Sequence, residues 1–164
     1  MANKMRWRYG PKEGSCVVCA VDSATVIEIG DLLYLDTDDV KPASSQTDAG
    51  SEADNQIAFT EKFVGVAEQQ SRAGDTDNIR VRAIGVFEFD CAAATFEIGD
   101  LIGVDENSDG DALENQKVVK VNDSTQAIGL VAKRFTSNTT SVLVDVRSTK
   151  LGYGVKAGSA STAN

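Results

Sequence analysis

Two pairs of carboxylates occur in the same short pattern at two places in the chain. Glu28 and Asp31 flank an Ile-Gly step, and Glu97 and Asp100 flank a second one. Neighbouring carboxylates are side chains that general acid/base chemistry uses. A tight turn also favours Gly and Asp in this pattern, because Gly adopts positive φ and the Asp side chain accepts hydrogen bonds from the nearby backbone. Since the same corner occurs twice, the sequence favours a structural turn over a catalytic pair.

Other catalytic machinery is missing from the chain. There is no histidine, which removes the commonest general base and the commonest metal ligand. Serine triads and His-based metal sites are therefore excluded. A Gly-rich phosphate loop is also missing, because Gly152-x-Gly154 has no following helix pattern. We expect no enzyme, no cofactor and no nucleotide site.

An acidic stretch after the second carboxylate pair resembles the opening of an EF-hand loop. Oxygen-bearing side chains stand at alternate positions and Gly110 stands at the sixth. The twelfth position is Gln116 in place of a bidentate Glu, and no helix pattern flanks the loop. The alternative is an acidic hairpin loop that turns at Asp109-Gly110. The candidate calcium ligands are Asp105, Asn107, Asp109 and Asp111.

The three cysteines, Cys16, Cys19 and Cys91, are an odd set that does not indicate a disulfide framework. The single C-x-x-C supplies two of the four ligands that a structural zinc needs. Because this pair lies in an apolar, β-favouring run, we expect buried thiols in a strand, with a redox or metal role as the alternative.

An internal repeat organises the elements that carry these residues. Residues 28–36 are nearly repeated at 97–105, and residues 63–67 are echoed at 127–131. Each echo leads through small polar residues into an alternating strand. The pattern predicts a β-meander unit used twice, over about residues 25–90 and 94–147.

The two copies differ in length. Gly30 and Gly99 stand 69 positions apart, whereas Gly65 and Gly129 stand 64 apart. We place the difference in the polar loop 42–56, since surface loops tolerate insertions. The predicted fold class is all-β: a compact barrel or sandwich of about a dozen short strands, with little helix beyond one turn near 92–94 or 60–63. One shared barrel and two packed lobes both remain open.

The composition limits the partners. The chain carries 16 Lys plus Arg against 25 Asp plus Glu, a net charge of -9. This balance argues against nucleic acid, which requires clustered cations. Neither an apolar run long enough to span a membrane nor a signal-peptide core is present, so we expect no membrane contact and synthesis in the host cytoplasm.

The N-terminus reverses the charge balance. Residues 1–14 hold four cations and two aromatic side chains against one Glu, a composition typical of a docking arm. The predicted organisation is an arm (1–14), a duplicated domain (15–148) and a flexible tail (149–164). In the alternative, Trp7 packs on its own domain and the cations are solvated. The candidate docking residues are Lys4, Arg6, Trp7, Arg8, Tyr9 and Lys12.

Five motifs follow one another over roughly residues 26–147. They are Val64-Gly65-Val66-Ala67, Ala73-Gly74-Asp75, Gly85-Val86-Phe87-Glu88-Phe89, Glu97-Ile98-Gly99-Asp100-Leu101 and Ile128-Gly129-Leu130-Val131-Ala132. In this order they resemble the small capsid decoration, or head-stabilising, proteins of tailed phages.

The resemblance implies a structural virion protein without catalysis. Such a protein binds the exterior of a mature capsid, commonly as a homotrimer, and cements neighbouring subunits of the major capsid protein. The chain departs from the smaller family members in its basic arm, its insertion at 42–56 and its tail. The alternatives are a phage tail or fibre component, or a calcium- or carbohydrate-binding β-domain.

Overall fold

The computed structural model describes residues 5–9 and 16–155. It is mostly β with one short helix, which confirms the all-β prediction. The strands are β1 (Trp7–Tyr9), β2 (Cys16–Cys19), β3 (Leu32–Asp36), β4 (Asp39–Pro42), β5 (Phe63–Ala67), β6 (Ile79–Arg82), β7 (Ile84–Phe96), β8 (Leu101–Glu106), β9 (Leu113–Lys120), β10 (Gly129–Val131) and β11 (Phe135–Arg147). The helices are α1 (Glu52–Thr60) and the short 3-10 turns η1 (Ala43–Ser45) and η2 (Ser124–Gln126).

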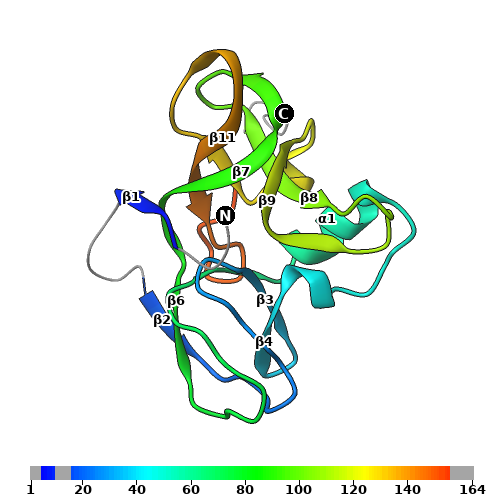
Figure 1. Cartoon of the computed structure of the whole chain (residues 1–164), viewed down its shortest axis with the longest axis vertical. Helices are drawn as coiled ribbons and strands as arrows, with labels where there is room; N and C mark the ends of the chain where they lie inside the picture. Colours follow the sequence, from blue (N-terminus) through cyan, green and yellow to red (C-terminus); the bar gives the residue numbers. More distant parts are fainter. Residues whose placement is uncertain (1–4, 10–15, 156–164) are drawn as a thin grey trace, which may run out of the picture.

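The duplication is visible in the strand order. The first repeat forms a sheet in the order β2-β6-β5-β3-β4, and the second forms β7-β11-β10-β8-β9, which is the same order. Strand β1 adds to the outer edge of β7. The two sheets lie at opposite ends of the long axis in Figure 1, with β2–β6 below and β7–β11 above. The two sheets therefore show the predicted internal repeat, but the units span about 16–82 and 84–147 in place of 25–90 and 94–147, because β2 and β7 hold equivalent places.

Both sheets close through an equivalent contact. In the second repeat Asp90 pairs in parallel with Lys117, which joins β7 to β9 and makes a five-stranded barrel. In the first repeat an isolated parallel bridge joins Ala20 to Asp39, and the amide of Val40 donates to the Ala20 carbonyl at 2.9 Å. The chain therefore forms two packed units, each with its own sheet.

The repeated glycines are required by close strand approach. A Cβ at Gly65 would lie 2.0 Å from the carbonyl oxygen of Arg82, and one at Gly129 would lie 2.3 Å from that of Asp145. Any side chain at either position would push β5 from β6, or β10 from β11. Both repeats therefore have a glycine at this position because the neighbouring strand leaves no room for a side chain.

The length difference between the repeats has two opposing sources. Leu35 faces Val40 across a short tip, whereas the equivalent Val104 faces Val118 across a tip nine residues longer. From Val40 to Gly65, in contrast, the first repeat is fourteen residues longer than the second is from Val118 to Gly129. Placing the whole difference in a 42–56 loop was wrong, because the longer β8–β9 tip cancels most of that insertion.

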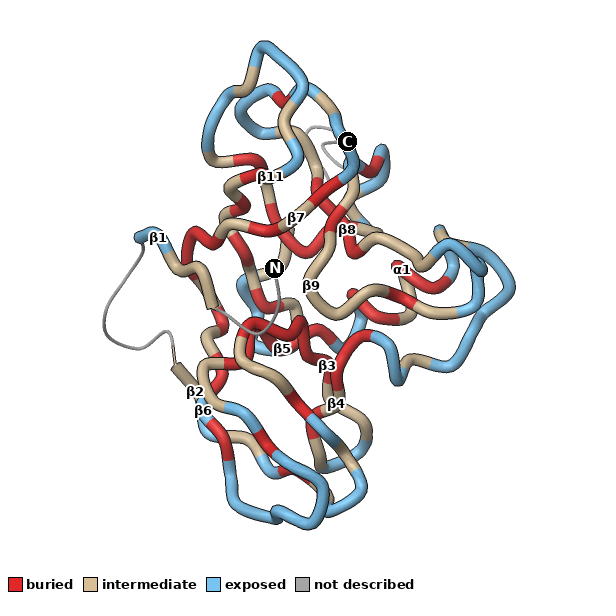
Figure 2. The backbone as a smooth tube through the Cα atoms, in the orientation of Figure 1, coloured by how far each residue is buried: buried red, intermediate tan, exposed pale blue. Residues whose placement is uncertain are grey.

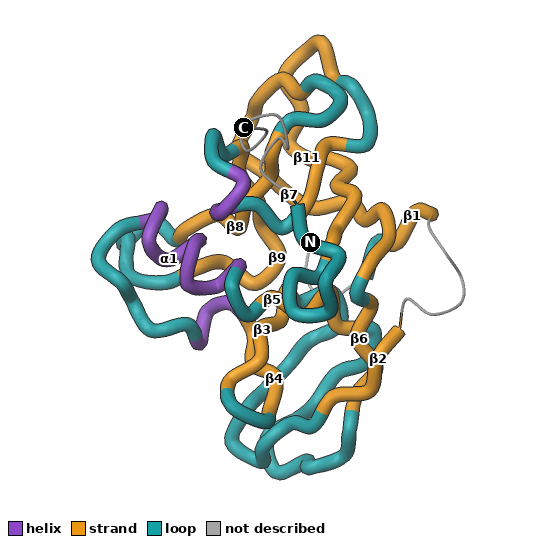
Figure 3. The backbone as a smooth tube through the Cα atoms, turned by 180° about the vertical axis from the view of Figure 1, so that it is seen from behind, coloured by secondary structure: helices purple, strands orange, loops and turns teal. Residues whose placement is uncertain are grey.

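The insertion is also not a simple loop, because it contains η1 and α1. Ser51 caps α1 by accepting a hydrogen bond from the Asp54 amide at 3.2 Å. The helix buries Asn55 and Gln56, and the Gln56 amide donates to the Val104 carbonyl at 2.8 Å. No apolar period marks a helix whose buried face includes amides, so the sequence did not indicate it. Figure 3 shows α1 at one side of the molecule, where it contacts β8 and η2.

The sequence also predicts a strand over 25–29 and a central place in its sheet for the strand at 17–21, and both predictions were wrong. Thr25 to Ile29 forms no strand and makes only an isolated bridge from Ile27 to Ser71. Of the two places given for a helical turn, 92–94 has none, since β7 runs unbroken to Phe96 and pairs with the long β11, whereas α1 ends at Thr60. Strand β2 is not central, because it pairs along its length only with β6.

The buried apolar residues form two clusters. Figure 2 shows the buried positions along the backbone in red. One face of the first repeat lines its own sheet, with Leu33, Val40 and Val81 among its members. The opposite face, with Leu32 and Val66, joins the interior of the second barrel in one larger cluster. The two repeats therefore share a core. No helix in the described part of the chain is long and apolar enough to cross a membrane.

Candidate functional site

The described part of the N-terminal segment, residues 5–9, lies on the body as an edge strand. Trp7 is the partner of Phe87 and Tyr9 of Val86, with an irregularity between them. The amide of Glu88 donates to the Arg6 carbonyl at 2.9 Å. Lys4 and Lys12 lie outside the described residues. The segment is therefore positioned by β7, next to β2 in sequence and at the left of Figure 1.

Two cations of the segment are paired with β7. The guanidinium of Arg6 lies 3.3 Å from Glu88 Oε1 and 3.0 Å from Asp90 Oδ1, and its side chain is 14% exposed. Arg8 donates to Glu88 Oε2. Hydrogen bonding from Arg8, with the positive charges of Arg8 and Arg6, holds the pKa of Glu88 below its ordinary value. These two cations are thus ion-paired and not simply solvated.

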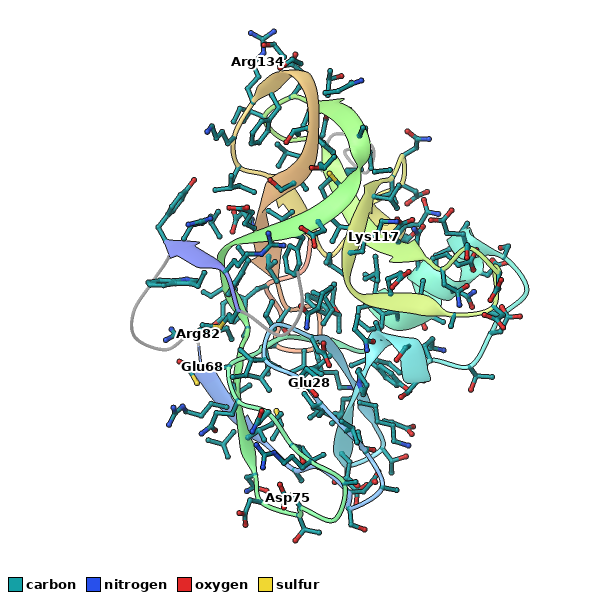
Figure 4. The ribbon with its side chains drawn as sticks, viewed as in Figure 1. Glu28, Glu68, Asp75, Arg82, Lys117 and Arg134 are labelled. Atoms are coloured by element: carbon teal, nitrogen blue, oxygen red, sulfur yellow. The ribbon has the colours of Figure 1, made fainter. Side chains whose placement is uncertain are left out.

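Trp7 packs on its own domain. It contacts the shared core, and the Arg82 guanidinium lies 5.5 Å from the centroid of its ring. A Cβ at Gly85 would lie 2.8 Å from Trp7 Nε1, so that glycine makes room for the indole. Figure 4 shows Arg82 close to Glu68, and their ion pair spans 3.4 Å. Trp7 therefore behaves as in the alternative interpretation of the arm, in which it packs on its own domain.

The outward part of the segment is exposed. Tyr9 is 52% exposed, and the side chain of Arg8 is 49% exposed although it reaches Glu88. Strand β1 ends its sheet, and no described residue pairs with its outer edge. The segment therefore has a buried anchor, Arg6 and Trp7, and an exposed side, Arg8 and Tyr9.

The sequence interpretation missed the anchor's partners, Glu88 and Asp90. Their spacing is the available signal, because alternating acids on a strand match the alternating cations Arg6 and Arg8. The chain separates the two groups by more than 80 residues. The alternating charges of residues 6–8 and 88–90 therefore identify the pairing only if the two segments are already assumed to be neighbouring strands.

The calcium candidates do not converge on a common point. Asp105 pairs with Lys117 at 3.0 Å. The side-chain oxygen of Asn107 accepts from the amides of Gly110 and Asp111, and its nitrogen donates to the Asp111 carboxylate at 2.8 Å. Among residues 5–9 and 16–155, no group of three or more potential ligands could hold a metal ion. The oxygen atoms of this loop organise a hairpin turn.

The repeated carboxylate corners are tight turns, as the sequence favoured. In each corner the Asp side chain accepts from the Glu amide at 2.9 Å, in Glu28–Asp31 and in Glu97–Asp100. Gly30 and Gly99 have φ values of 96° and 85°. The carboxylates are used to fix backbone, and neither corner presents a free acid/base pair.

A polar groove at the junction of the repeats was not expected. It has a volume of about 470 Å³ and is lined by residues that include Glu28, Asn115 and Lys117. Gln116 donates to Asp31 Oδ1 at 2.7 Å and to the Ile29 carbonyl at 3.2 Å. Burial raises the pKa of Asp31, although the hydrogen bonds from Gln116 and from the Glu28 amide act to lower it. The pair joins the two repeats, and 85 residues separate its members in the sequence.

The thiols lie in strands, as the sequence favoured. Cys16 and Cys19 are partly buried in β2, and Cys91 is buried in β7. All three are free, and burial raises the pKa of each. A raised pKa keeps the reactive thiolate scarce.

Comparisons with known proteins return few relatives. No protein-family model and no curated protein matches the chain. Among solved structures, the chain resembles the N-terminal base of the head fibre gp8.5 of bacteriophage phi29, with 13% sequence identity. The alignment covers 87% of this chain and 99% of that one, with a TM-score of 0.43. A likeness at that score does not establish a shared function.

Proposed function

We propose that this chain is a structural virion protein that binds the exterior of a mature phage capsid and cements neighbouring subunits of the major capsid protein. The support comes first from the ordered motifs over residues 26–147, which resemble the decoration proteins of tailed phages. In that role the protein acts as a homotrimer, is made in the host cytoplasm and resides on the capsid surface. A scaffold of this kind needs rigidity and a contact surface in place of a catalytic centre.

The open edge of β1 is the observation that carries the proposal. A strand that ends a sheet presents unpaired amide and carbonyl groups to which another chain can add. Arg8 and Tyr9 lie on this edge strand, and both are about half exposed. Arginine and tyrosine are enriched among residues that dominate binding energy at interfaces. Strand β1 therefore combines an open main-chain edge with suitable side chains.

The anchor makes this edge ready for binding. Arg6 is held by Glu88 and Asp90, and Trp7 is held by the core and Arg82. A segment that is ordered before binding loses less conformational entropy when the partner arrives. Arg6 and Trp7 are therefore anchoring residues, whereas Arg8 and Tyr9 contact the capsid.

Co-sedimentation with expanded capsid shells that lack this protein tests the proposal. Wild-type protein is expected to bind saturably, near one copy per major capsid subunit. Deletion of residues 2–12 is expected to abolish binding, because it removes both the strand and its side chains. Since that deletion also uncovers β7, an Arg8→Ser/Tyr9→Ser variant is the second test. It removes the two exposed side chains and the Arg8–Glu88 ion pair, keeps the strand with Arg6 and Trp7, and is expected to weaken binding by at least about tenfold.

The control is Tyr153→Ser, which removes a tyrosine that is 44% exposed outside the N-terminal segment. It is expected to bind like the wild type. Full binding by a folded deletion variant and by the double variant would remove the segment from the capsid contact. Absence of wild-type binding to any shell would reject the proposed function.

A further inference from the structure

The hairpins that join β5 to β6 and β10 to β11 begin alike and then differ. The amide of Glu68 donates to the Arg80 carbonyl at 2.9 Å, and the amide of Ala132 donates to the Leu143 carbonyl at the same distance. In the first repeat the Arg80 amide then bonds the side chain of Gln69, at 2.8 Å, in place of the opposite backbone. Beyond this point the two arms of the β5–β6 hairpin border a cavity of about 250 Å³.

The wall of this cavity is polar and acidic. Residues 69–71 line it from one arm, and residues 75 and 77–79 line it from the other. The wall contains two carboxylates, Asp75 and Asp77, together with amide side chains and one hydroxyl, and it contains no Lys or Arg. Figure 4 shows Asp75 at the lower end of the molecule. The cavity therefore offers oxygen atoms and negative charge to a cation.

One polar group in the wall is buried without a partner. Ser71 is 2% exposed, and no hydrogen bond joins its hydroxyl to the described residues. The amide and the carbonyl of Ser71 are both bonded to Ile27, at 2.9 Å each. Only the side chain of Ser71 is thus left to bond something in the cavity. A buried hydroxyl without a partner destabilises the fold, and a ligand in the cavity supplies the missing contact.

The acidic arm has ligand oxygens that the protein itself does not use. Asp75 Oδ2 accepts a hydrogen bond from the Arg72 amide at 3.2 Å, which leaves Oδ1 available. Asp77 and Asn78 are exposed, and neither side chain has a hydrogen-bond or ion-pair partner in the described part of the chain. Two carboxylates at alternate positions followed by an amide are oxygen ligands of the kind that Ca²⁺ prefers.

We propose that this cavity binds a calcium ion through the carboxylates of Asp75 and Asp77, the amide oxygen of Asn78 and the hydroxyl of Ser71. Water completes the shell, because Ca²⁺ takes about six to eight oxygen ligands in a flexible geometry. The wall holds no His or Cys, the ligands that zinc prefers. The described residues contain no cluster of three or more acidic, histidine or cysteine ligands, so the neutral oxygens are a necessary part of this site.

Equilibrium dialysis of the chelator-treated, full-length chain against radioactive calcium tests this inference. The wild type is expected to bind about one ion with a dissociation constant of about 10⁻⁴–10⁻³ M, as weak calcium modules do. Its melting temperature is expected to rise with calcium concentration. Asp77→Asn is expected to raise the dissociation constant at least about tenfold, and the exposed position of Asp77 makes this variant suitable for folding.

Ser71→Ala separates a ligand from a structural side chain. It is expected to weaken calcium binding by at least about threefold. Without calcium it is expected to melt no lower than the wild type, since the hydroxyl has no partner to lose. A calcium affinity equal to that of the wild type would overturn the role of Ser71.

The matched control is Asp109→Asn, which removes an acid from the 105–111 loop and is expected to bind calcium like the wild type. No bound calcium at about 10 mM would overturn the inference. Wild-type affinity in Asp77→Asn would also overturn it, as would loss of binding in Asp109→Asn. The inference does not depend on the capsid role, since calcium binding is measured without shells.

Discussion

The Glu28–Asp31 corner lies at the junction of the repeats, whereas the Glu97–Asp100 corner lies at the surface. The two turns are made by matching hydrogen bonds, including amide-to-carboxylate contacts of 2.9 Å in each. The Asp side chains nevertheless have opposite environments. Asp31 is 2% exposed and is held by Gln116, and Asp100 is paired with Lys120. The local sequence therefore determines the turn, and the rest of the fold determines the energetics of its side chains.

The same distinction applies to the leucines that follow the two corners, Leu32 and Leu101. Leu32 is buried by the second repeat, and Leu101 remains at the surface. Equivalent residues of the two repeats therefore have the same backbone position but contribute differently to the stability of the fold. The following variants test that comparison, in order of decreasing expected effect.

Leu32→Ala is expected to reduce the free energy of unfolding by about 2–5 kcal/mol, because it leaves a cavity in the shared core. Leu101→Ala is expected to cost less than about 1 kcal/mol, since its side chain is partly solvated. Urea denaturation of both variants measures the difference. Equal losses would show that the two faces are covered alike.

Gly65→Ala and Gly129→Ala are each expected to reduce the free energy of unfolding by about 1–3 kcal/mol, because the added Cβ meets a carbonyl oxygen of the neighbouring strand. Gly74→Ala is the control, since no atom lies within 4 Å of its Cβ, although its φ of 93° carries a smaller penalty. Urea denaturation compares all three. A tolerated change at one of the paired glycines would break the equivalence of the repeats.

The hairpin tips differ in how they provide positive φ. Gly110 provides it in the second repeat, with φ of 73°, whereas Thr37 has φ of 61° in the first. A β-branched residue is strained in this region. Thr37→Asn is expected to raise the free energy of unfolding by about 0.5–1 kcal/mol, and Thr136→Asn, in β11, is the control without gain. A loss of stability in Thr37→Asn would show that the backbone at Thr37 is not strained.

The corner aspartates should give opposite pH dependences. Because the folded-state pKa of Asp31 is raised by burial, its contribution to stability is present below its unfolded pKa and is lost as pH rises through the folded pKa. Burial alone would raise the pKa of Asp100, but the hydrogen bonds from Lys120 and the Glu97 amide hold it below the ordinary value. Its contribution is present above the unfolded pKa and is lost as pH falls.

Asp31→Asn is therefore expected to gain stability relative to the wild type between pH 3 and pH 7. Asp100→Asn is expected to lose stability over the same range, by about 0.2–1 kcal/mol, because its ion pair is partly solvated. Thermal melting across that range measures both slopes. Slopes of the same sign would contradict the opposite charge environments.

The repeat, its corners and most of its strands could be predicted because their signals are local. The Ile-Gly-Asp step fixes a turn wherever it occurs, and alternation marks strands such as β6 and β11. Helix α1 could not be predicted, since its buried face includes Asn55 and Gln56, whose partners lie in β8 and neighbouring loops. The Asp31–Gln116 contact and the Arg6 anchor join residues more than 80 positions apart. Such contacts follow from the packing of the repeats, which the sequence left open.

Electron cryomicroscopy of expanded shells saturated with this protein tests the proposed capsid contact. We expect density for both repeats on the outer capsid surface, with the β1 edge, Arg8 and Tyr9 against the major capsid protein. Shells without added density, or with the protein bound only through another face while β1 remains in solvent, would contradict it.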